Sequence, residues 1–196
     1  MEIHAFLSTG EAYSGSTDPN SAGNGSLMRL APIAMYFGGD ERQIQEMAAL
    51  SSLTTHGAPE CLDACRLFAV ALSRAIQGRP KAEVLDLADL PLTSPKLKQL
   101  AMGGIGDSDR AQISGSGYVV ESLEAALWCF ARHNNFRSTV LEAANLGDDA
   151  DTTAAIAGQL AGAYYGVDGI PVDWLRRLHL ATEIGALADS IWMARR

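Results

Sequence analysis

Apolar residues recur every three or four positions along several long segments of the chain, the spacing that places them on one face of a helix. This pattern predicts helices over residues 40–56, 58–78, 82–87, 95–102, 117–133, 136–147 and 151–166, and one or two helices within 171–196. A shorter apolar segment covers residues 31–37. No segment alternates convincingly between apolar and polar residues, as a half-buried strand would. The sequence therefore predicts an all-α fold.

Three loops between these helices are rich in Gly, Ser, Asn and Asp. They cover residues 13–29, 103–118 and 145–153, and we call them the polar loops. Binding residues concentrate on loops that a rigid scaffold holds in place. We therefore expect the polar loops to meet on one side of the helical domain and to form a polar site.

Length and charge narrow the class of protein. The 196 residues predict a single domain, residues 1–196, with a sizeable core. The net charge of −8 and the scattered Lys and Arg residues argue against a partner that is a nucleic acid or an anionic membrane. No apolar run reaches the ~18 residues that a membrane span needs.

Cysteine usage indicates a reducing compartment. The chain has three cysteines, Cys61, Cys65 and Cys129, an odd number without the spacing of a disulfide framework. We expect them to be buried and to pack as small hydrophobic residues, with a redox or metal role as the lesser alternative. The first residues lack the basic and apolar regions of a signal peptide, so a cytoplasmic location is expected.

The segment from Asp148 to Thr153 carries the strongest chemical signal. It places three aspartates and two threonines within six positions, directly before an Ala- and Gly-rich helix. One interpretation is a rich helix cap, with Asp151 or Thr152 at the N-cap and the other carboxylates stabilised by the helix dipole. The other is a site for a hard cation such as Mg²⁺ or Mn²⁺, because clustered carboxylates repel one another unless a cation lies between them. The sequence alone leaves both interpretations open.

The segment 145–166, NLGDDADTTAAIAGQLAGAYYG, resembles the C-terminal signature of the ADP-ribosylglycohydrolase family. The segments 21–34, 54–61 and 113–130 resemble three further blocks of the family, in the family's order. The resemblance implies an all-α orthogonal helical bundle that cleaves the N- or O-glycosidic bond of ADP-ribose attached to a protein side chain, often arginine, or of related ADP-ribosyl compounds. It also implies a cleft that holds two Mg²⁺ or Mn²⁺ ions, with ADP-ribose or an ADP-ribosylated protein as the partner.

The same resemblance assigns roles to individual residues. By motif match, Asp149, Asp151 and Thr152 are the metal ligands, and Asp148 is at most a neighbour of the site. The ligand-binding residues would be Ser21, Gly23, Asn24, Gly25, His56, Ser116, Gly117 and Tyr118. Without the resemblance, these residues also fit a plain turn, a core or surface histidine and a flexible helix entry.

The family's N-terminal metal block, a Thr-Asp-Asp sequence after a Gly- and Asp-rich segment, has no counterpart in this chain. We therefore expect an N-terminally truncated fold, the C-terminal two thirds of the family's domain, with the catalytic acid or base supplied by the missing part. One metal ion or none would then remain, because two hard cations need about twelve oxygen ligands between them. The alternative to an enzyme is a catalytically incomplete ADP-ribose-binding module, or a fragment that needs a partner chain. Apolar helix faces left exposed would favour a homo-oligomer.

Overall fold

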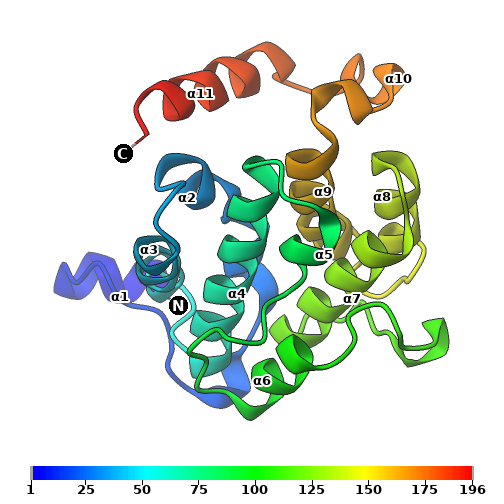
Figure 1. The fold of residues 1–196 in the computed structure, drawn as a ribbon. Coiled ribbons are helices and arrows are strands. Elements are labelled where there is room, and N and C mark those ends of the chain that lie inside the picture. Colours follow the sequence, from blue (N-terminus) through cyan, green and yellow to red (C-terminus); the bar gives the residue numbers. More distant parts are fainter. Residues whose placement is uncertain (1, 196) are drawn as a thin grey trace.

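The structure is a computed structural model that describes residues 2–195, and within this part the chain forms helices, two isolated β-bridges and no strand (Figure 1). The α-helices are α1 (Glu2–Thr9), α2 (Ala31–Tyr36), α3 (Glu41–Leu53), α4 (Pro59–Ile76), α5 (Lys81–Val84), α6 (Pro95–Met102), α7 (Val119–Arg132), α8 (Phe136–Ala144), α9 (Ala150–Tyr165), α10 (Val172–Leu175) and α11 (Ala181–Met193). Short 3-10 helices are η1 (Pro19–Ser21), η2 (Asn24–Arg29), η3 (Arg110–Gln112) and η4 (Val167–Gly169). The all-α prediction is confirmed.

Helix α4 forms the centre of the core. Most of its side chains are buried, including Leu67, Phe68 and Leu72, which are fully inaccessible. It packs against α3 on one side and against α7 and α9 on the other (Figure 1). A helix that is apolar on nearly every face needs neighbours all round, and this sequence places α4 where it has them.

Local sequence signals set several helix ends. Asp40 accepts hydrogen bonds from the first backbone N–H groups of α3, and Ser94 does the same for α6. Asn135 caps α8 in the same way. Helix α9 ends at Gly166, which adopts a positive φ of 72°. These ends lie within a few residues of the predicted ones.

Helix α9 is well packed. Its buried residues Ile156, Ala157, Leu160 and Ala161 lie among α4, α7 and α8, and its small side chains allow close approach. Gln159 extends the packing to η2 because its amide bonds to the backbone at two points, Leu27 O and Ala31 N. These contacts pack one side of α9 against the described helices.

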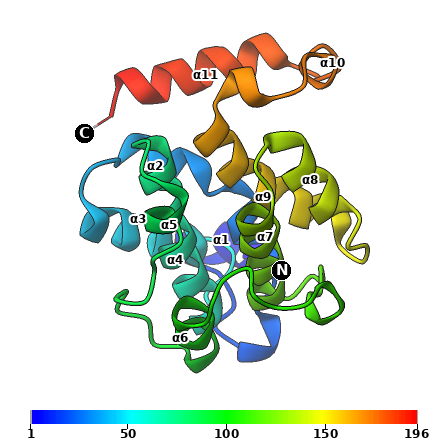
Figure 2. The same ribbon diagram turned by 45° about the vertical axis from the view of Figure 1, so that its right-hand side comes forward.

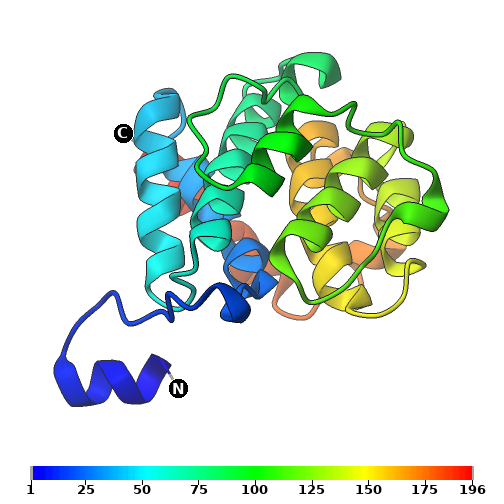
Figure 3. The same ribbon diagram turned by 90° about the horizontal axis from the view of Figure 1, so that it is seen from below.

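Exposed apolar side chains are found on the helices near the two ends of the chain, α1 and α11. Helix α11 has no buried residue and exposes Ile184, Leu187 and Trp192, and it touches the rest of the molecule mainly through α2 (Figures 1 and 2). Helix α1, which the apolar pattern did not predict, lies away from the helical body with Phe6 and Leu7 exposed (Figure 3). Both helices therefore expose apolar surface that the described residues leave uncovered.

The three cysteines are buried and free, as predicted. Burial raises the pKa of the Cys61 and Cys129 thiols to about 12, and it raises the pKa of the Cys65 thiol as well. These thiols are therefore protonated at neutral pH and pack as small apolar groups. Among residues 2–195, no helix is both long enough and apolar enough to cross a bilayer.

Candidate functional site

Backbone hydrogen bonds join the polar loops. Gly23 and Tyr118 form an isolated antiparallel β-bridge, which pairs the first loop with the second. The N–H of Asp149 donates to the carbonyl of Gly115 over 2.9 Å, which pairs the third loop with the second. The prediction that the polar loops meet at one site is confirmed.

Asn24 connects this site to helix α7 and to the start of helix α9. Its side chain is buried, and Nδ2 donates to Oδ2 of Asp149 over 2.7 Å and to Oγ of Ser122 on α7 over 2.8 Å. This hydrogen bond is the main reason that the pKa of the Asp149 carboxyl lies below its ordinary value. Burial opposes it, and Thr152 and Asp151 add smaller contributions in the same direction as Asn24. The carboxylate is thus held ionised and in one orientation.

The start of α9 differs from the plain-cap interpretation. The N-cap position belongs to Asp149, ahead of both Asp151 and Thr152, and its side chain makes no capping hydrogen bond to the helix. Asp149 bonds to Asn24 instead. The preceding Asp148 has a positive φ of 55°, a backbone conformation that redirects the chain into the helix. Capping therefore does not explain the acidic cluster.

The predicted metal ligands lie close together. The side chains of Thr152 and Asp151 lie near enough to the Asp149 carboxyl to lower its pKa. Their oxygen donors are of the kind that Mg²⁺ and Mn²⁺ prefer. Across residues 2–195, however, no three His, Cys, Asp or Glu side chains converge as a metal-binding group. The donor set fits part of the coordination shell of a hard cation and leaves the rest to other ligands.

His56 lies against the glycine turn of the first loop. A Cβ added at Gly25 would lie 2.9 Å from Cε1 of His56, and one at Gly23 would lie 3.6 Å from its Nε2. Nδ1 shares a hydrogen bond of 2.8 Å with the hydroxyl of Thr55, and the backbone of His56 forms the second β-bridge, with Ser16. The structure therefore brings His56 to the predicted ligand-binding turn, where a side chain at Gly25 would displace it.

The remaining predicted ligand residues surround a shallow hollow of about 380 Å³. Ser21, Gly23, Gly117 and Tyr118 all line it. A Cβ at Gly117 would lie 3.7 Å from Oδ2 of Asp149, so the hollow and the acidic cluster adjoin. Absence of a side chain at this point lets the backbone lie directly beside the carboxylate.

Ser116 and Ser21 have mainly local roles. Ser116 Oγ donates to Glu121 Oε2 over 2.5 Å and accepts from the N–H of Tyr118, so it shapes the entry to α7. Ser21 Oγ bonds to Ser16 and to the carbonyl of Asp18 within its own loop. Both residues border the site and stabilise its loops.

Tyr118 is held by two residues that sequence reasoning missed. Its hydroxyl donates to Oε2 of Glu60 over 2.5 Å and accepts from Nζ of Lys96 over 2.7 Å, and Lys96 Nζ also lies 4.8 Å from the centre of the Tyr118 ring. Glu60 stands in the first turn of α4 and Lys96 in the first turn of α6. The ring is therefore fixed between two helices at the edge of the hollow. Ser122 was missed as well, although it is a polar residue within the apolar face of α7.

Comparison with known proteins shows to which family the chain belongs. A model of the ADP-ribosylglycohydrolase family matches residues 2–196. The chain belongs to the ADP-ribosylglycohydrolase family. A solved structure entitled "ADP-ribosylglycohydrolase-related protein complex" superimposes with a TM-score of 0.91 at 39% identity, and the match covers 100% of this chain and 68% of that one. The fold is thus the ADP-ribosylglycohydrolase fold, as the resemblance implied.

Two curated members of the ADP-ribosylglycohydrolase family show how far the similarity extends. The ADP-ribosylarginine hydrolase Tri1 of Pseudomonas putida (strain GB-1) is 40% identical over 190 residues, which is 97% of this chain and 51% of that protein. The ADP-ribosyl-[dinitrogen reductase] glycohydrolase of Rhodospirillum rubrum is 31% identical over 162 residues, 83% of this chain and 52% of that protein. The chain thus spans about half the length of the curated relatives it matches.

Proposed function

We propose that this site binds the ADP-ribosyl group and takes part in the metal-dependent hydrolysis of its bond to a protein side chain, of the ADP-ribosylarginine type. The observation that carries the proposal is the Asn24–Asp149 hydrogen bond of 2.7 Å, which fixes an ionised carboxylate beside the glycine turn, Gly117 and His56. The names of the relatives support it, since one is an ADP-ribosylarginine hydrolase and another removes ADP-ribose from dinitrogen reductase.

The glycine-rich loops suit the phosphates of this ligand. Gly23, Gly25 and Gly117 have no side chain to keep a diphosphate away from the backbone N–H groups. His56, packed against this turn, would lie beside the distal ribose. Tyr118 would contact the adenosine end from the far edge of the hollow.

Asp149, Asp151 and Thr152 would hold Mg²⁺ or Mn²⁺, up to two ions in a complete site. A bound cation supplies Lewis acidity, which polarises the ribose oxygens and lowers the pKa of a bound water. The chain's own part is to orient the first carboxylate through Asn24 and to keep it ionised. No residue of this chain is assigned as the general acid or base, which we propose lies in a part of the family fold that this chain does not contain.

The second candidate function is an ADP-ribose-binding module that needs a partner chain for catalysis. The partial donor set at Asp149 favours it, as does the length of the relatives, of which the chain spans about half. Apolar faces of α1 and α11 would serve a homo-oligomer or such a partner. A cytoplasmic location and correspondence to the C-terminal two thirds of the family fold remain predictions.

The first experiment measures the thermal unfolding of the chain with ADP-ribose, with and without Mg²⁺. Ligand at a hundredfold excess over its Kd stabilises the folded state by about 2.7 kcal/mol. We expect a shift that requires Mg²⁺ and is lost in Asp149→Ala, with the exposed Asp89→Ala as the matched control. Release of ADP-ribose from ADP-ribosylarginine then separates the hydrolase from the binding module. A shift that persists in Asp149→Ala with a chelator present would contradict the proposed site.

A further inference from the structure

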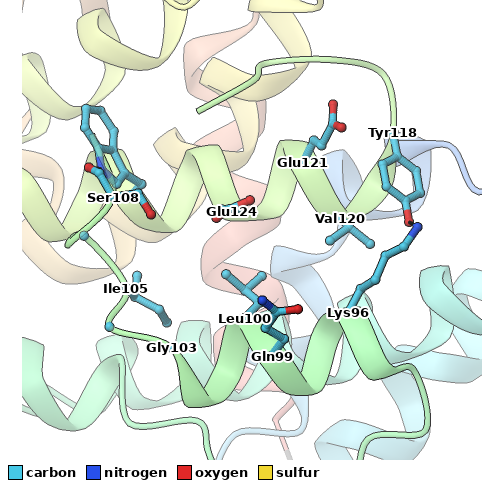
Figure 4. Close-up of a pocket in the computed structure, with 13 residues that line it drawn as sticks. Lys96, Gln99, Leu100, Gly103, Ile105, Ser108, Tyr118, Val120, Glu121 and Glu124 are labelled. Atoms are coloured by element: carbon cyan, nitrogen blue, oxygen red, sulfur yellow. Dashed lines mark hydrogen bonds between the residues drawn. The ribbon is translucent and has the colours of Figure 1, made fainter. Parts of the chain in front are cut away.

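Two rings border the glycine turn of the first loop, and a basic side chain is linked to each of them. One is Tyr118, whose hydroxyl accepts a hydrogen bond from Lys96 between α6 and α7 (Figure 4). The other is His56, whose ring lies against Gly23 and Gly25. A neutral imidazole has one nitrogen that donates and one that accepts. The contacts of His56 therefore decide which of the two groups the ring presents to this turn.

The backbone of His56 is fixed on all sides. Its N–H donates to the carbonyl of Ser52 over 2.7 Å, and its carbonyl accepts from the Ser52 hydroxyl over 2.7 Å. The N–H of Gly57, the next residue, donates to the carbonyl of Ser16 over 2.9 Å. Gly15 lies so close that a Cβ there would stand 2.5 Å from the backbone nitrogen of His56. The backbone is thus held in one place, and the direction of the ring depends on side-chain contacts.

The hydroxyl of Thr55 orients the ring. It lies 2.8 Å from Nδ1 of His56 and accepts a hydrogen bond of 2.7 Å from Nη2 of Arg29. A guanidinium has donors only, so Thr55 offers a lone pair, and not its hydrogen, to Arg29. Within residues 2–195 this hydroxyl has no third partner. Its hydrogen is therefore left for Nδ1 of His56, which acts as the acceptor.

Arg29 is itself held at the end of α3. The same nitrogen lies 3.2 Å from the carbonyl of Ser51 and 3.1 Å from the hydroxyl of Thr54. Ser51 belongs to the last turn of α3, and Thr54 follows the helix directly. A cation at this end of a helix is favoured by the helix dipole. Because Arg29 is the last residue of η2, its side chain connects the segment that starts at the glycine turn to the end of α3.

The hydrogen of the imidazole then belongs to Nε2, because Nδ1 is the acceptor. The edge of the ring that carries Nε2 faces the glycine turn. A Cβ added at Gly25 would lie 3.0 Å from Nε2 of His56, and one at Gly23 would lie 3.6 Å from it. The N–H group is therefore directed at the part of the loop where ligand oxygens would lie.

We propose that Arg29 and Thr55 are positioning residues, which hold His56 as the neutral Nε2–H tautomer so that the ring presents a donor at the glycine turn. The part of this inference that concerns the ligand rests on the proposed function, since the hydroxyl and phosphate oxygens of an ADP-ribosyl group can accept this bond. In the opposite tautomer, the lone pair of Nε2 would face a phosphate oxygen and leave it unpaired.

The first measurement is a long-range proton–nitrogen NMR spectrum of the free protein at pH 8, above the ordinary histidine pKa of about 6.5. Nitrogen chemical shifts distinguish the two tautomers, and a His56→Gln sample assigns the signals. Wild-type protein should show the Nε2–H tautomer alone. Thr55→Val removes the hydroxyl, and Arg29→Met frees that hydroxyl to accept from Nδ1–H, so both variants should show a mixture. Thr55→Ser keeps the hydroxyl and should restore the single tautomer.

Thr54→Val is the matched control. It removes a neighbouring hydroxyl that also accepts from Arg29 but donates to Ser51. The His56 signals of this variant should be those of wild type. A mixture, a protonated ring or the Nδ1–H tautomer in wild type overturns the inference and leaves the proposed function standing. So does a single Nε2–H tautomer in Thr55→Val or Arg29→Met, or a mixture in Thr54→Val.

Calorimetry with ADP-ribose and Mg²⁺ tests what the tautomer does for the ligand. The Kd of Thr55→Val should rise by the inverse of the fraction that carries the hydrogen on Nε2, about twofold for an equal mixture. Thr55→Ser should bind as wild type does. An unchanged Kd in a Thr55→Val protein with mixed tautomers overturns the donor role of His56. Wild-type protein that shows the single tautomer and binds no ADP-ribose overturns the proposed function and, with it, that donor role.

Discussion

Asp63 tests how the start of α6 is held against the core. Its side chain is fully buried in α4, and Oδ2 accepts hydrogen bonds from Thr93 N, Thr93 Oγ1 and Ser94 N over 2.5, 2.9 and 2.7 Å. Oδ1 pairs with Arg66 over 2.7 Å. Ser94 is the N-cap of α6, so this one carboxylate anchors the start of that helix to the core.

The loss in the free energy of unfolding follows from the groups that would lose their hydrogen-bond acceptor in Asp63→Ala. Two backbone N–H groups, those of Thr93 and Ser94, lose their acceptor, and each such loss costs about 1–3 kcal/mol. The Thr93 hydroxyl can rotate to water, and the Arg66 side chain is partly exposed and can be solvated, so neither adds much. The expected loss in the free energy of unfolding is therefore about 2–6 kcal/mol.

Urea denaturation at pH 7 measures this loss as a shift of the midpoint. Asp89→Ala is the matched control, because Asp89 is exposed on the loop before α6 and should change stability by less than about 0.5 kcal/mol. If the free energy of unfolding of Asp63→Ala lies within about 1 kcal/mol of the wild-type value, the reasoning that this carboxylate anchors α6 is wrong.

The same residue gives a pH dependence with a defined sign. Burial alone would raise the pKa of Asp63, but the hydrogen bonds from Ser94, Thr93 and Arg66 outweigh it, so the pKa is lowered. A lowered pKa in the folded state means that the stabilisation is present above the unfolded value of about 4 and is lost as the pH falls through the folded value. The difference between wild type and Asp63→Ala should therefore shrink below about pH 4. A difference that stays constant into acid would contradict the assignment.

Three further substitutions test the site and its support. Asn24→Ala should raise the pKa of the Asp149 carboxyl, because it removes the hydrogen bond that lowers it most; an NMR titration that shows no change would refute this. Gly25→Ala should weaken ADP-ribose binding in calorimetry while stability changes by about 1 kcal/mol or less, since the new methyl group would lie 2.9 Å from the His56 ring and displace it. Lys81→Met should lower the free energy of unfolding by about 2–3 kcal/mol in a denaturant titration. The Lys81 ammonium group donates to the carbonyls of Phe130 and His133 and to the hydroxyl of Tyr165, and the variant loses all three bonds. A loss below about 0.5 kcal/mol would show that water replaces the ammonium group.

Much of the fold was predictable because its signals are local. The predicted helix 95–102 has the bounds of α6, since Ser94 and Pro95 mark its start in the sequence itself. The helix of residues 58–78 was found from its apolar spacing and corresponds to α4. The acidic start of α9 was recognised from its residue types alone. These features depend on neighbours within a few positions, which a sequence displays directly.

The rest depended on contacts between distant segments. The partners of Tyr118 are Glu60 and Lys96, which are 58 and 22 positions away, and either could have been a solvated surface charge. Asn24 lies 125 positions from Asp149, so nothing in its own segment indicated that it would hold this carboxylate. The N-cap of α9 is Asp149, whose side chain bonds to Asn24 and makes no capping bond, and the sequence alone did not indicate this arrangement.

The way the polar loops are joined has a consequence for how the site opens. The backbone hydrogen bonds between the loops are few. Asn24 N to Gly117 O and Val119 N to Ala22 O hold the first loop to the second, and Asp149 N to Gly115 O holds the third to the second. The Asn24 side chain adds a bond from the first loop to the third. No sheet backs them within residues 2–195, so separating one loop from its neighbour removes the support of the next. Amides joined in this way exchange with solvent through a shared opening. We therefore expect the three loops to open as one cooperative unit, and a ligand that bridges any two of them to slow hydrogen exchange in all three.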